Sequence, residues 1–399
     1  MISLISCVGN IENKFNTNSL ETDKEIGTQV PEVIPAAERL QLYIPDLQNK
    51  KVGLVINHTS RVGKTHLIDT LLSLDIDVHK IFAPEHGFKG EADAGEKVKD
   101  NLYRGIEVIS LYGKNRKPTS AHMDGLDVII FDIQDVGVRF YTYISTMTYV
   151  MEAAAESDVH MIVLDRPNPN GHYIDGPILQ KELTSFIGMH QVPVVYGMTI
   201  GEYALMVNGE QWLIDGAKTS LNVIPCNNYD HNTLYDLPIK PSPNLPNLRS
   251  ILLYPSLCFF EGTNVSIGRG TDKQFQLVGH PAIQSNFKFT PLSGPGSKYP
   301  KLQDKECYGE DLSQLDPFWI KTQNKLMLDW LVKYYKELND RGEVFFLDNN
   351  FFDKLAGTPM LKKQIEQGYS AEEIRKGWQG GIEDFKEIRE KYLLYADFN

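Results

Sequence analysis

The stretch "LDVIIFDIQD" (residues 126–135) decides the fold class of this chain. Its first half is almost continuously apolar and shows no alternation of polar and apolar side chains. Alternation indicates a strand with one face in water, whereas a short continuous apolar run is typical of a strand that is covered on both faces. Such strands occur in parallel sheets that carry helices on both sides. The stretch therefore predicts the centre of an α/β fold.

The segments around this stretch alternate between strand and helix patterns. Short apolar runs predict strands, and apolar residues three and four positions apart predict helices. The predicted strands are 51–58, 78–83, 106–113, 126–135, 160–171 (running into a turn) and 192–197, and the predicted helices are 64–74, 143–158 and 199–213. This alternation implies a mostly parallel sheet with helices on both faces. The chain lacks G-x-G-x-x-G after the first strand and lacks G-x-x-x-x-G-K-[ST], so its sequence gives no support to a dinucleotide or P-loop site.

Length and charge restrict the possibilities further. The chain has 399 residues, and single hydrophobic cores usually stop growing near about 250–300 residues, so we expect two domains. The formal net charge of −12 argues against nucleic acid as a partner, because phosphate binding requires a basic surface. No apolar run approaches the ~20 residues of a membrane-spanning helix.

Polar side chains follow four of the predicted strands. They are Asn57 and His58, Glu85 and His86, Asp132, and Asp165 and Arg166. In open parallel sheets, ligands bind beyond the carboxyl ends of the strands. The loop "IFAPEHGFKGEADAGEK" (81–97) adds Glu91, Asp93 and Glu96 to the same edge. We interpret this edge as a candidate site.

Two further polar stretches belong to the candidate site. "FDIQDVGVRFYTY" (131–143) contributes Arg139, Tyr141 and Tyr143, and "EGTNVSIGRGTDK" (261–273) contributes Glu261, Asn264 and Arg269. The second stretch is rich in glycine, which lets a backbone approach a ligand closely, and we interpret it as a binding loop. Arg139 either pairs with a nearby aspartate, Asp132 or Asp135, or binds a ligand, and the sequence favours neither.

Several carboxylates, tyrosines and an arginine in one cleft suit the hydrolysis of a glycosidic bond. One acid must protonate the leaving oxygen while a second group stabilises or attacks the anomeric carbon. Glu85, at a strand end among other acids, fits the proton donor. The competing interpretation is a site for Mg²⁺ or Mn²⁺, ions that prefer carboxylate ligands. Its ligands would be Glu85, His86, Asp93 and Asp132.

A set of motifs then points to a family. They are "NHTSRV" (57–62), "APEHGFKGEADAGEKV" (83–98), "LYGKNRKPT" (111–119), "FDIQDVGVRFYTYISTM" (131–147), "LDRPNPNG" (164–171), "YGMTIGEYA" (196–204), "PSPNLPN" (241–247) and "FEGTNVSIGRGTDKQF" (260–275). Together they resemble the NamZ-type exo-β-N-acetylmuramidase family from about residue 40 to the closing "YLLY" (392–395). Members release terminal N-acetylmuramic acid from the non-reducing ends of peptidoglycan fragments. The family's PEHG glutamate, regarded as catalytic, falls on Glu85. Ala83 stands where serine is common in the family, a change that removes a hydroxyl and no acid.

The resemblance also implies an architecture. We expect a Rossmann-like, doubly wound, mostly parallel sheet and a smaller α+β C-terminal domain, with the active site in the cleft between them. The expected parts are a tether over 1–38, the Rossmann-like domain over 39–235 and the C-terminal domain over 236–399. The patterns of 318–338 and 370–395 predict helices in the last part.

The predicted site follows from these steps. We predict Glu85 and Asp132 as catalytic, and Asn57, His58, His86, Glu91, Asp93, Arg139, Tyr141, Tyr143, Glu261, Asn264 and Arg269 as substrate-binding. The predicted partners are peptidoglycan-derived saccharides, and no cofactor and no resident metal is predicted. The second catalytic group is left open between Asp132, Glu261 and the substrate's own 2-acetamido oxygen.

N-Acetylmuramic acid differs from N-acetylglucosamine by one lactyl carboxylate, which requires a placed cation in a chain of net charge −12. Arginine is suited to this because its planar fork can pair with both carboxylate oxygens. Arg269, between two glycines, is favoured over Arg139 for this role.

The N-terminal stretch "MISLISC" (1–7) resembles the lipobox of bacterial lipoproteins, with Cys7 as the residue that would carry the lipid. A working signal needs a basic stretch and a longer apolar core ahead of that point, so either the true start lies upstream or the match is accidental. The lipobox interpretation predicts a lipid-anchored protein of the periplasm or cell envelope. A lipoprotein that binds muropeptides without cutting them is the alternative function.

Overall fold

The computed structural model describes residues 31–85, 87–88, 101–113 and 115–398, and the chain from Val33 onward forms one compact unit. Five of the residues singled out above lie outside the described residues: Cys7, His86, Glu91, Asp93 and Glu96. Among the described residues, no helix is both long and apolar enough to cross a membrane.

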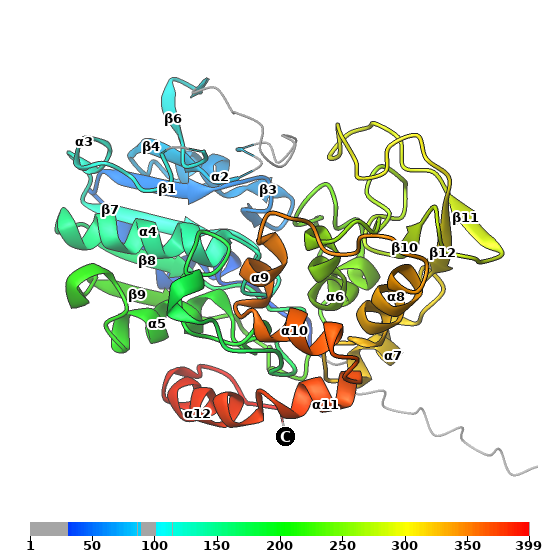
Figure 1. The fold of residues 1–399 in the computed structure, drawn as a ribbon. Coiled ribbons are helices and arrows are strands. Elements are labelled where there is room, and N and C mark those ends of the chain that lie inside the picture. Colours follow the sequence, from blue (N-terminus) through cyan, green and yellow to red (C-terminus); the bar gives the residue numbers. More distant parts are fainter. Residues whose placement is uncertain (1–30, 86, 89–100, 114, 399) are drawn as a thin grey trace, which may run out of the picture. The chain divides into compact units, whose positions relative to one another are not determined.

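A seven-stranded sheet forms the N-terminal half (Figure 1). Its strand order is β5-β6-β4-β1-β7-β8-β9, and β5 alone among these strands runs antiparallel to its neighbour. The strands are β1 (Val52–Ile56), β4 (Val78–Ala83), β5 (Asn101–Tyr103), β6 (Ile106–Ser110), β7 (Val128–Asp132), β8 (His160–Leu164) and β9 (Leu221–Ile224). The apolar run within residues 126–135 forms β7, which lies between β1 and β8 near the centre of the sheet. The predicted mostly parallel α/β sheet is confirmed.

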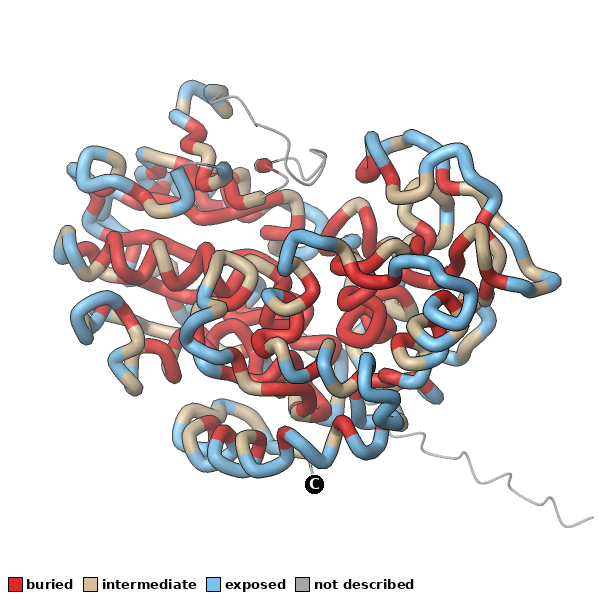
Figure 2. The backbone as a smooth tube through the Cα atoms, viewed as in Figure 1, coloured by how far each residue is buried: buried red, intermediate tan, exposed pale blue. Residues whose placement is uncertain are grey.

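Two layers of helices explain why β7 is apolar throughout. Ile129 and Phe131 belong to the hydrophobic cluster that packs against α4 (Tyr143–Glu156) and α5 (Ile200–Gly209). Their neighbour Ile130 belongs to the cluster on the opposite face. The helices of that second face are α1 (Ile44–Leu47) and α2 (Leu67–Ser73). Both faces of the sheet are therefore buried, as the tube coloured by burial shows (Figure 2).

The C-terminal half combines a small sheet with helices. Strands β10 (Leu277–His280), β12 (Cys307–Asp311) and β11 (Phe287–Phe289) form a three-stranded antiparallel sheet in that order. The helices are α6 (Leu248–Leu257), α7 (Pro317–Thr322), α8 (Asp329–Asn339), α9 (Phe351–Ala356), α10 (Met360–Glu366), α11 (Ala371–Lys376) and α12 (Gln379–Arg389). An α+β arrangement was expected here. The boundary between residues 235 and 236 stays a prediction.

One local expectation was wrong, and several elements were not anticipated. The segment 192–197 is not a strand of the sheet: Val195 forms only isolated bridges, with Val138 and Asp175, and Pro193 has no N–H to donate. The Pro-rich segment 240–248 leads into α6, which Asn247 caps by accepting from the backbone N–H of Ser250. β9 and the short elements β2 (Arg61–Val62), β3 (Thr65–His66) and α3 (Ser120–Met123) carried no pattern that predicted them.

Candidate active site

Glu85 lies at the carboxyl end of β4, beside the N-terminus of α4. Pro84 ends the strand, and the backbone N–H of Gly87 closes a turn onto the Pro84 carbonyl at 2.9 Å. The half-buried Glu85 carboxylate accepts a hydrogen bond from Thr142 Oγ1 at 2.8 Å. Thr142 is the residue directly before α4. Two elements of the sheet layer therefore fix the position of this acid.

A cavity of about 300 Å³ opens in front of Glu85. Its walls come from both halves of the chain: Glu85, Phe140, Tyr141, Thr142, Tyr143, Ile187, Ser242, Asn244, Leu245, Tyr254, Cys258, Glu261, Arg269, Phe275, Phe351 and Leu355. Five residues of the predicted site are among them: Glu85, Tyr141, Tyr143, Glu261 and Arg269. This placement agrees with the expected cleft between an N-terminal and a C-terminal part.

Glu261 and Arg269 form an ion pair in the wall opposite the sheet. Glu261 belongs to the 3-10 helix Cys258–Gly262 that follows α6, and Arg269 stands in the glycine-flanked loop. Arg269 Nη1 donates to Glu261 Oε1 at 2.9 Å, and the two side chains keep 27% and 21% of their surface exposed. The pair is thus reachable by a molecule in the cavity.

Three tyrosines line the floor between the two acids. The rings of Tyr141 and Tyr143 meet edge to face at 5.0 Å, and those of Tyr141 and Tyr254 at 5.8 Å. Burial raises the pKa of each phenol above its ordinary value, and the negative charge of Glu85 adds to the rise. The phenols therefore stay protonated at neutral pH.

Asp132, predicted as catalytic, has a structural position instead. Its side chain is fully buried and accepts from Arg166 Nε at 2.6 Å and from Arg166 Nη2 at 2.9 Å. It is not among the described residues that line the cavity. Because both carboxylate oxygens are bound by one guanidinium, we correct the prediction: Asp132 closes the end of β7 and does not face the site.

Asp165, at the end of β8, is also committed to the scaffold. Its carboxylate accepts from the backbone N–H groups of Arg166 and Gly201 and from the hydroxyls of Thr199 and Tyr395, at 2.5–2.9 Å. Burial, with the nearby Glu202, raises the pKa of Asp165 to about 6. The four donors saturate its oxygens, so it joins β8, α5 and the C-terminal segment.

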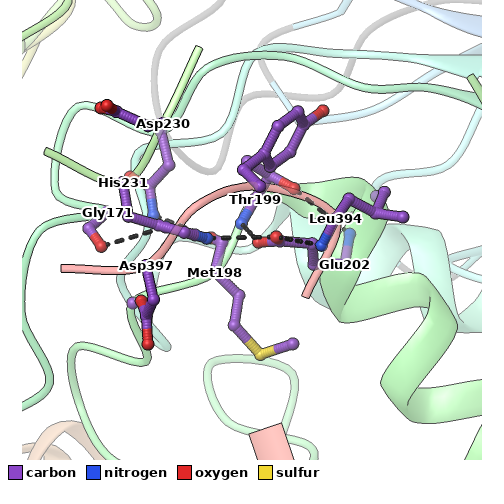
Figure 3. Close-up of polar contacts among 12 residues, drawn as sticks. Gly171, Met198, Thr199, Glu202, Asp230, His231, Leu394 and Asp397 are labelled. Atoms are coloured by element: carbon purple, nitrogen blue, oxygen red, sulfur yellow. Dashed lines mark hydrogen bonds and ion pairs between the residues drawn. The ribbon is translucent and has the colours of Figure 1, made fainter. Parts of the chain in front are cut away.

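Figure 3 shows the polar contacts of Glu202 and His231. Glu202 Oε1 accepts from the backbone N–H of Leu394 at 2.8 Å and from His231 Nε2 at 3.1 Å, while Oε2 accepts from the N–H of Thr199 at 2.8 Å. His231 Nδ1 contacts the Gly171 carbonyl at 3.2 Å. Thr199, Glu202 and His231 are buried, and none of these contacting residues is among those that line the cavity.

Arg139 is structural as well, and the aspartates considered as its partners do not bind it. Its guanidinium donates to the carbonyl oxygens of Pro177, Val192, Leu355 and Ala356, at 2.7–3.1 Å. Burial lowers the pKa of Arg139 to about 9. Because these contacts attach the end of α9 to the 177–192 segment, Arg139 fixes a wall of the cavity without entering it. The predicted substrate-binding role is corrected to a positioning one.

Asp135, the other aspartate considered for Arg139, binds a tyrosine. Its Oδ2 accepts from Tyr196 OH at 2.5 Å and from the N–H of Gly137 at 2.7 Å, while its buried Oδ1 has no hydrogen-bond partner among the described residues. Burial raises the pKa of Asp135 to about 6.

The other described residues of the predicted site do not line the cavity. The buried Asn57 donates to Tyr143 OH at 3.1 Å, His58 Nε2 donates to the Lys240 carbonyl at 2.8 Å, and Asn264 donates to the Val344 carbonyl at 2.8 Å. None of the three is among the described lining residues. Asn57 therefore acts by orienting a tyrosine of the floor.

Sequence reasoning missed several cavity residues. Thr142 carried a usable signal, because it directly precedes a predicted helix, where Thr often caps or orients the first turn. Asn244 lies in the motif "PSPNLPN" (241–247), to which no role was assigned, and no pattern singled out Tyr254. Phe351 and Leu355 reach the cavity from a helix far along the chain, and no local pattern could have placed them.

No group of three or more His, Cys, Asp or Glu side chains is arranged to hold a metal ion among the residues that the structure describes. Of the four ligands considered for Mg²⁺ or Mn²⁺, Glu85 contacts Thr142, and Asp132 contacts Arg166. His86 and Asp93 lie outside the described residues.

Comparison with known proteins gives concordant results. Residues 52–249 match the family model "Exo-beta-N-acetylmuramidase NamZ, N-terminal", and residues 252–395 match its C-terminal counterpart. The chain is 38% identical to the peptidoglycan beta-N-acetylmuramidase NamZ of Bacillus subtilis (strain 168) over 88% of its own length and 89% of that protein.

Solved structures agree with this relation. A DUF1343 family protein from Bacteroides fragilis is 48% identical, with a TM-score of 0.84 over 92% of this chain and 100% of that one. A second DUF1343 protein of the same organism is 28% identical, with a TM-score of 0.76 over the same shares. The two family models together span nearly all of the described fold, and the chain therefore belongs to the NamZ family of exo-β-N-acetylmuramidases.

Proposed function

We propose that this protein hydrolyses the glycosidic bond of a terminal N-acetylmuramic acid at the non-reducing end of peptidoglycan fragments, with Glu85 as the proton donor. The Bacillus subtilis relative is named a peptidoglycan beta-N-acetylmuramidase, and the matching family models are named for an exo-beta-N-acetylmuramidase. The observation that carries the proposal is the placement of two carboxylates, Glu85 and Glu261, in the walls of one cavity of sugar-sized volume. Glycosidic cleavage needs an acid and a second group on the reacting centre.

The roles follow from the surroundings of each acid. Glu85 receives one hydrogen bond from Thr142 and can turn its other oxygen towards the leaving oxygen. Glu261 is the protein candidate for the second group, since Asp132 is bound to Arg166. The 2-acetamido oxygen of the substrate is the other candidate.

Arg269 supports the choice of an acidic amino sugar. It faces the cavity, whereas Arg139 is committed to four carbonyl oxygens behind the wall. We therefore assign recognition of the lactyl carboxylate to Arg269.

A chromogenic aryl β-N-acetylmuraminide tests the activity. The unaltered protein should release the chromophore, and Glu85→Gln should lower kcat/KM by about 10²–10⁴-fold, because the amide keeps the size but cannot donate a proton. Glu107→Gln is the matched control, because Glu107 is exposed on β6 and should leave the rate unchanged. Binding of the muraminide without release would instead identify a muropeptide-binding protein, and an active Glu85→Gln would remove Glu85 from the mechanism.

We also propose that the protein is held in the cell envelope through a lipid on Cys7. The support is the lipobox-like "LISC" (4–7) and the location of the proposed substrate outside the cytoplasm. In a host that processes lipoproteins, protein expressed with a complete upstream signal should fractionate with membranes, and Cys7→Ser should release it. Membrane association that survives Cys7→Ser would mean that the motif is accidental.

A further inference from the structure

A second cavity, of about 240 Å³, lies on the far side of the Glu261–Arg269 pair. It is lined by Glu261, Val265, Ser266, Ile267, Arg269, Ser297, Tyr299, Pro300 and Lys301. Glu261 and Arg269 line both cavities, so this ion pair is the partition between them. The outer wall of the second cavity comes from Ser297, Tyr299, Pro300 and Lys301, none of which belongs to the predicted site.

Arg269 has donors to spare at this partition. Its Nη1 binds Glu261 at 2.9 Å, and its Nη2 reaches the Gly296 carbonyl only at 3.5 Å. Its Nε is buried and has no hydrogen-bond partner among the described residues. The Nε and Nη2 groups form the edge of a guanidinium that can bind a carboxylate through two parallel hydrogen bonds. Arg269 is thus held in place by one acid, while the two donors of this edge have no hydrogen bond shorter than 3.5 Å among the described residues.

The lining of the second cavity carries an excess of positive charge, although the protein as a whole is negatively charged. Its described lining residues include two cations, Arg269 and Lys301, against one carboxylate, Glu261. Lys301 Nζ donates to the carbonyl oxygens of Phe260 and Thr263, which fixes its charge beneath the cavity. Burial lowers the pKa of Lys301 to about 8, which still leaves it mostly protonated at neutral pH. A carboxylate here is attracted by a local field opposite in sign to the net charge of −12.

The mouth of the cavity is open to solvent. Tyr299 at its rim is 84% exposed, and Ser266 and Ser297 add hydroxyls to its lining. A group that passes Arg269 can therefore continue outward instead of ending in a closed pocket.

We propose that the second cavity is the subsite for the carboxylate-bearing substituent on O3 of the muramoyl residue, with Arg269 gripping it at the partition. This inference rests on the proposed function, because only a muramoyl substrate carries such a group. Two sources share the chemistry: the free lactyl carboxylate, or the carboxylates of a peptide that extends from it.

Three aryl glycosides distinguish the sources: the muraminide with a free lactyl group, the same muraminide carrying L-alanyl-D-isoglutamine, and its neutral lactyl methylamide. The unaltered protein should show a KM at least about tenfold lower for a carboxylate-bearing substrate than for the methylamide, equivalent to about 1.4 kcal/mol. A lowest KM for the free lactyl substrate assigns the cavity to lactate. A lowest KM for the dipeptide substrate assigns it to peptide.

Ser297→Leu tests the cavity itself, because it fills the lining without changing charge or touching the first cavity. We expect KM for the preferred substrate to rise about tenfold, with kcat within about threefold and the methylamide KM unchanged. Ser293→Leu, the same change at an exposed position of the same loop, is the control. Tyr299→Ala, at a side chain that the fold does not need, should raise KM in the same selective way by about threefold and replaces Ser297→Leu if that variant does not fold.

An equal KM for all three glycosides, or an equal rise in KM with all three in the variants, overturns the inference while leaving the hydrolase intact. Failure of the unaltered protein to cleave any of the three overturns the proposed function instead.

Discussion

Two of the carboxylate–arginine pairs in the described structure differ in the hydrogen-bonding capacity that they leave unused. In the sheet layer, Asp132 and Arg166 are 0% and 7% exposed and share two hydrogen bonds. In the cavity wall, Glu261 and Arg269 are 21% and 27% exposed and share one. In the first pair both oxygens of the acid accept from Arg166, whose Nη2 also donates to the Arg61 carbonyl at 3.3 Å, and the pair is buried. The second holds an arginine in position while keeping donors for another ligand, so spare hydrogen-bonding capacity, rather than the presence of an ion pair, separates the site from the scaffold.

The largest predicted effect is on the free energy of unfolding and concerns the Asp132–Arg166 pair. Asp132→Asn should lower the free energy of unfolding by about 3–5 kcal/mol, because it leaves the buried Arg166 charge without compensation. Glu261→Gln should lower it by less than about 1 kcal/mol, since water reaches that pair. Chemical denaturation measures both. Similar losses for the two variants would contradict the contrast between the pairs.

The Glu261–Arg269 pair should instead control the preference between substrates. Arg269→Met should cost roughly 2–4 kcal/mol in kcat/KM for a muraminide and much less for the matching β-N-acetylglucosaminide, which has no lactyl carboxylate. Arg139 binds four backbone carbonyls behind the cavity wall. Arg139→Met should therefore lower the melting temperature and change kcat/KM for both substrates by the same factor. Equal losses on the two substrates for Arg269→Met would make Arg269 part of the scaffold or of the reacting centre.

A smaller effect concerns the pH dependence of folding stability, through the buried Asp135. The pKa of Asp135 is raised from 3.8 to about 6, so between these values the folded state keeps a proton that the unfolded state has lost. Stability should therefore fall as pH rises through this window, by up to about 1.4 kcal/mol per pH unit from this group. Asp135→Asn, which keeps an acceptor for Tyr196 and Gly137, should flatten that part of the profile in thermal melts across pH 4–6. An unchanged slope would mean that Asp135 ionises alike in both states.

The smallest predicted effect is that of chelation. If the acids of the cavity serve sugar chemistry, prolonged dialysis against EDTA should leave the rate of muraminide cleavage unchanged. A rate that falls and returns with Mg²⁺ or Mn²⁺ would support the metal-dependent alternative.

Sequence patterns anticipated the features that depend on local periodicity and burial. The apolar run of β7, the strand that ends at Ala83 and the position of Glu85 just beyond that end all follow from composition over a few residues. The glycine-flanked Arg269 was also placed in the cavity, because a glycine pair indicates close approach of the backbone to a ligand.

The partners of polar groups could not be anticipated in the same way. Asp132 has the sequence position of a site residue, but its carboxylate is bound by Arg166, which follows the neighbouring strand β8. Arg139 was matched to nearby aspartates, but its partners are carbonyls contributed by α9 and by the 177–192 segment. Such choices are made by packing between segments distant in sequence, and a local pattern contains no record of them.

The shared construction of the first cavity has a consequence for refolding kinetics. Glu85 comes from an early strand, Glu261 from the segment after α6, and Phe351 from α9, so the cavity depends on contacts of long sequence separation. Such contacts are costly in loop-closure entropy and tend to form late. On dilution from denaturant, helical circular dichroism should recover before catalytic turnover does. The recovery of enzyme activity therefore reports the last step of assembly, whereas the recovery of circular dichroism reports the earlier steps.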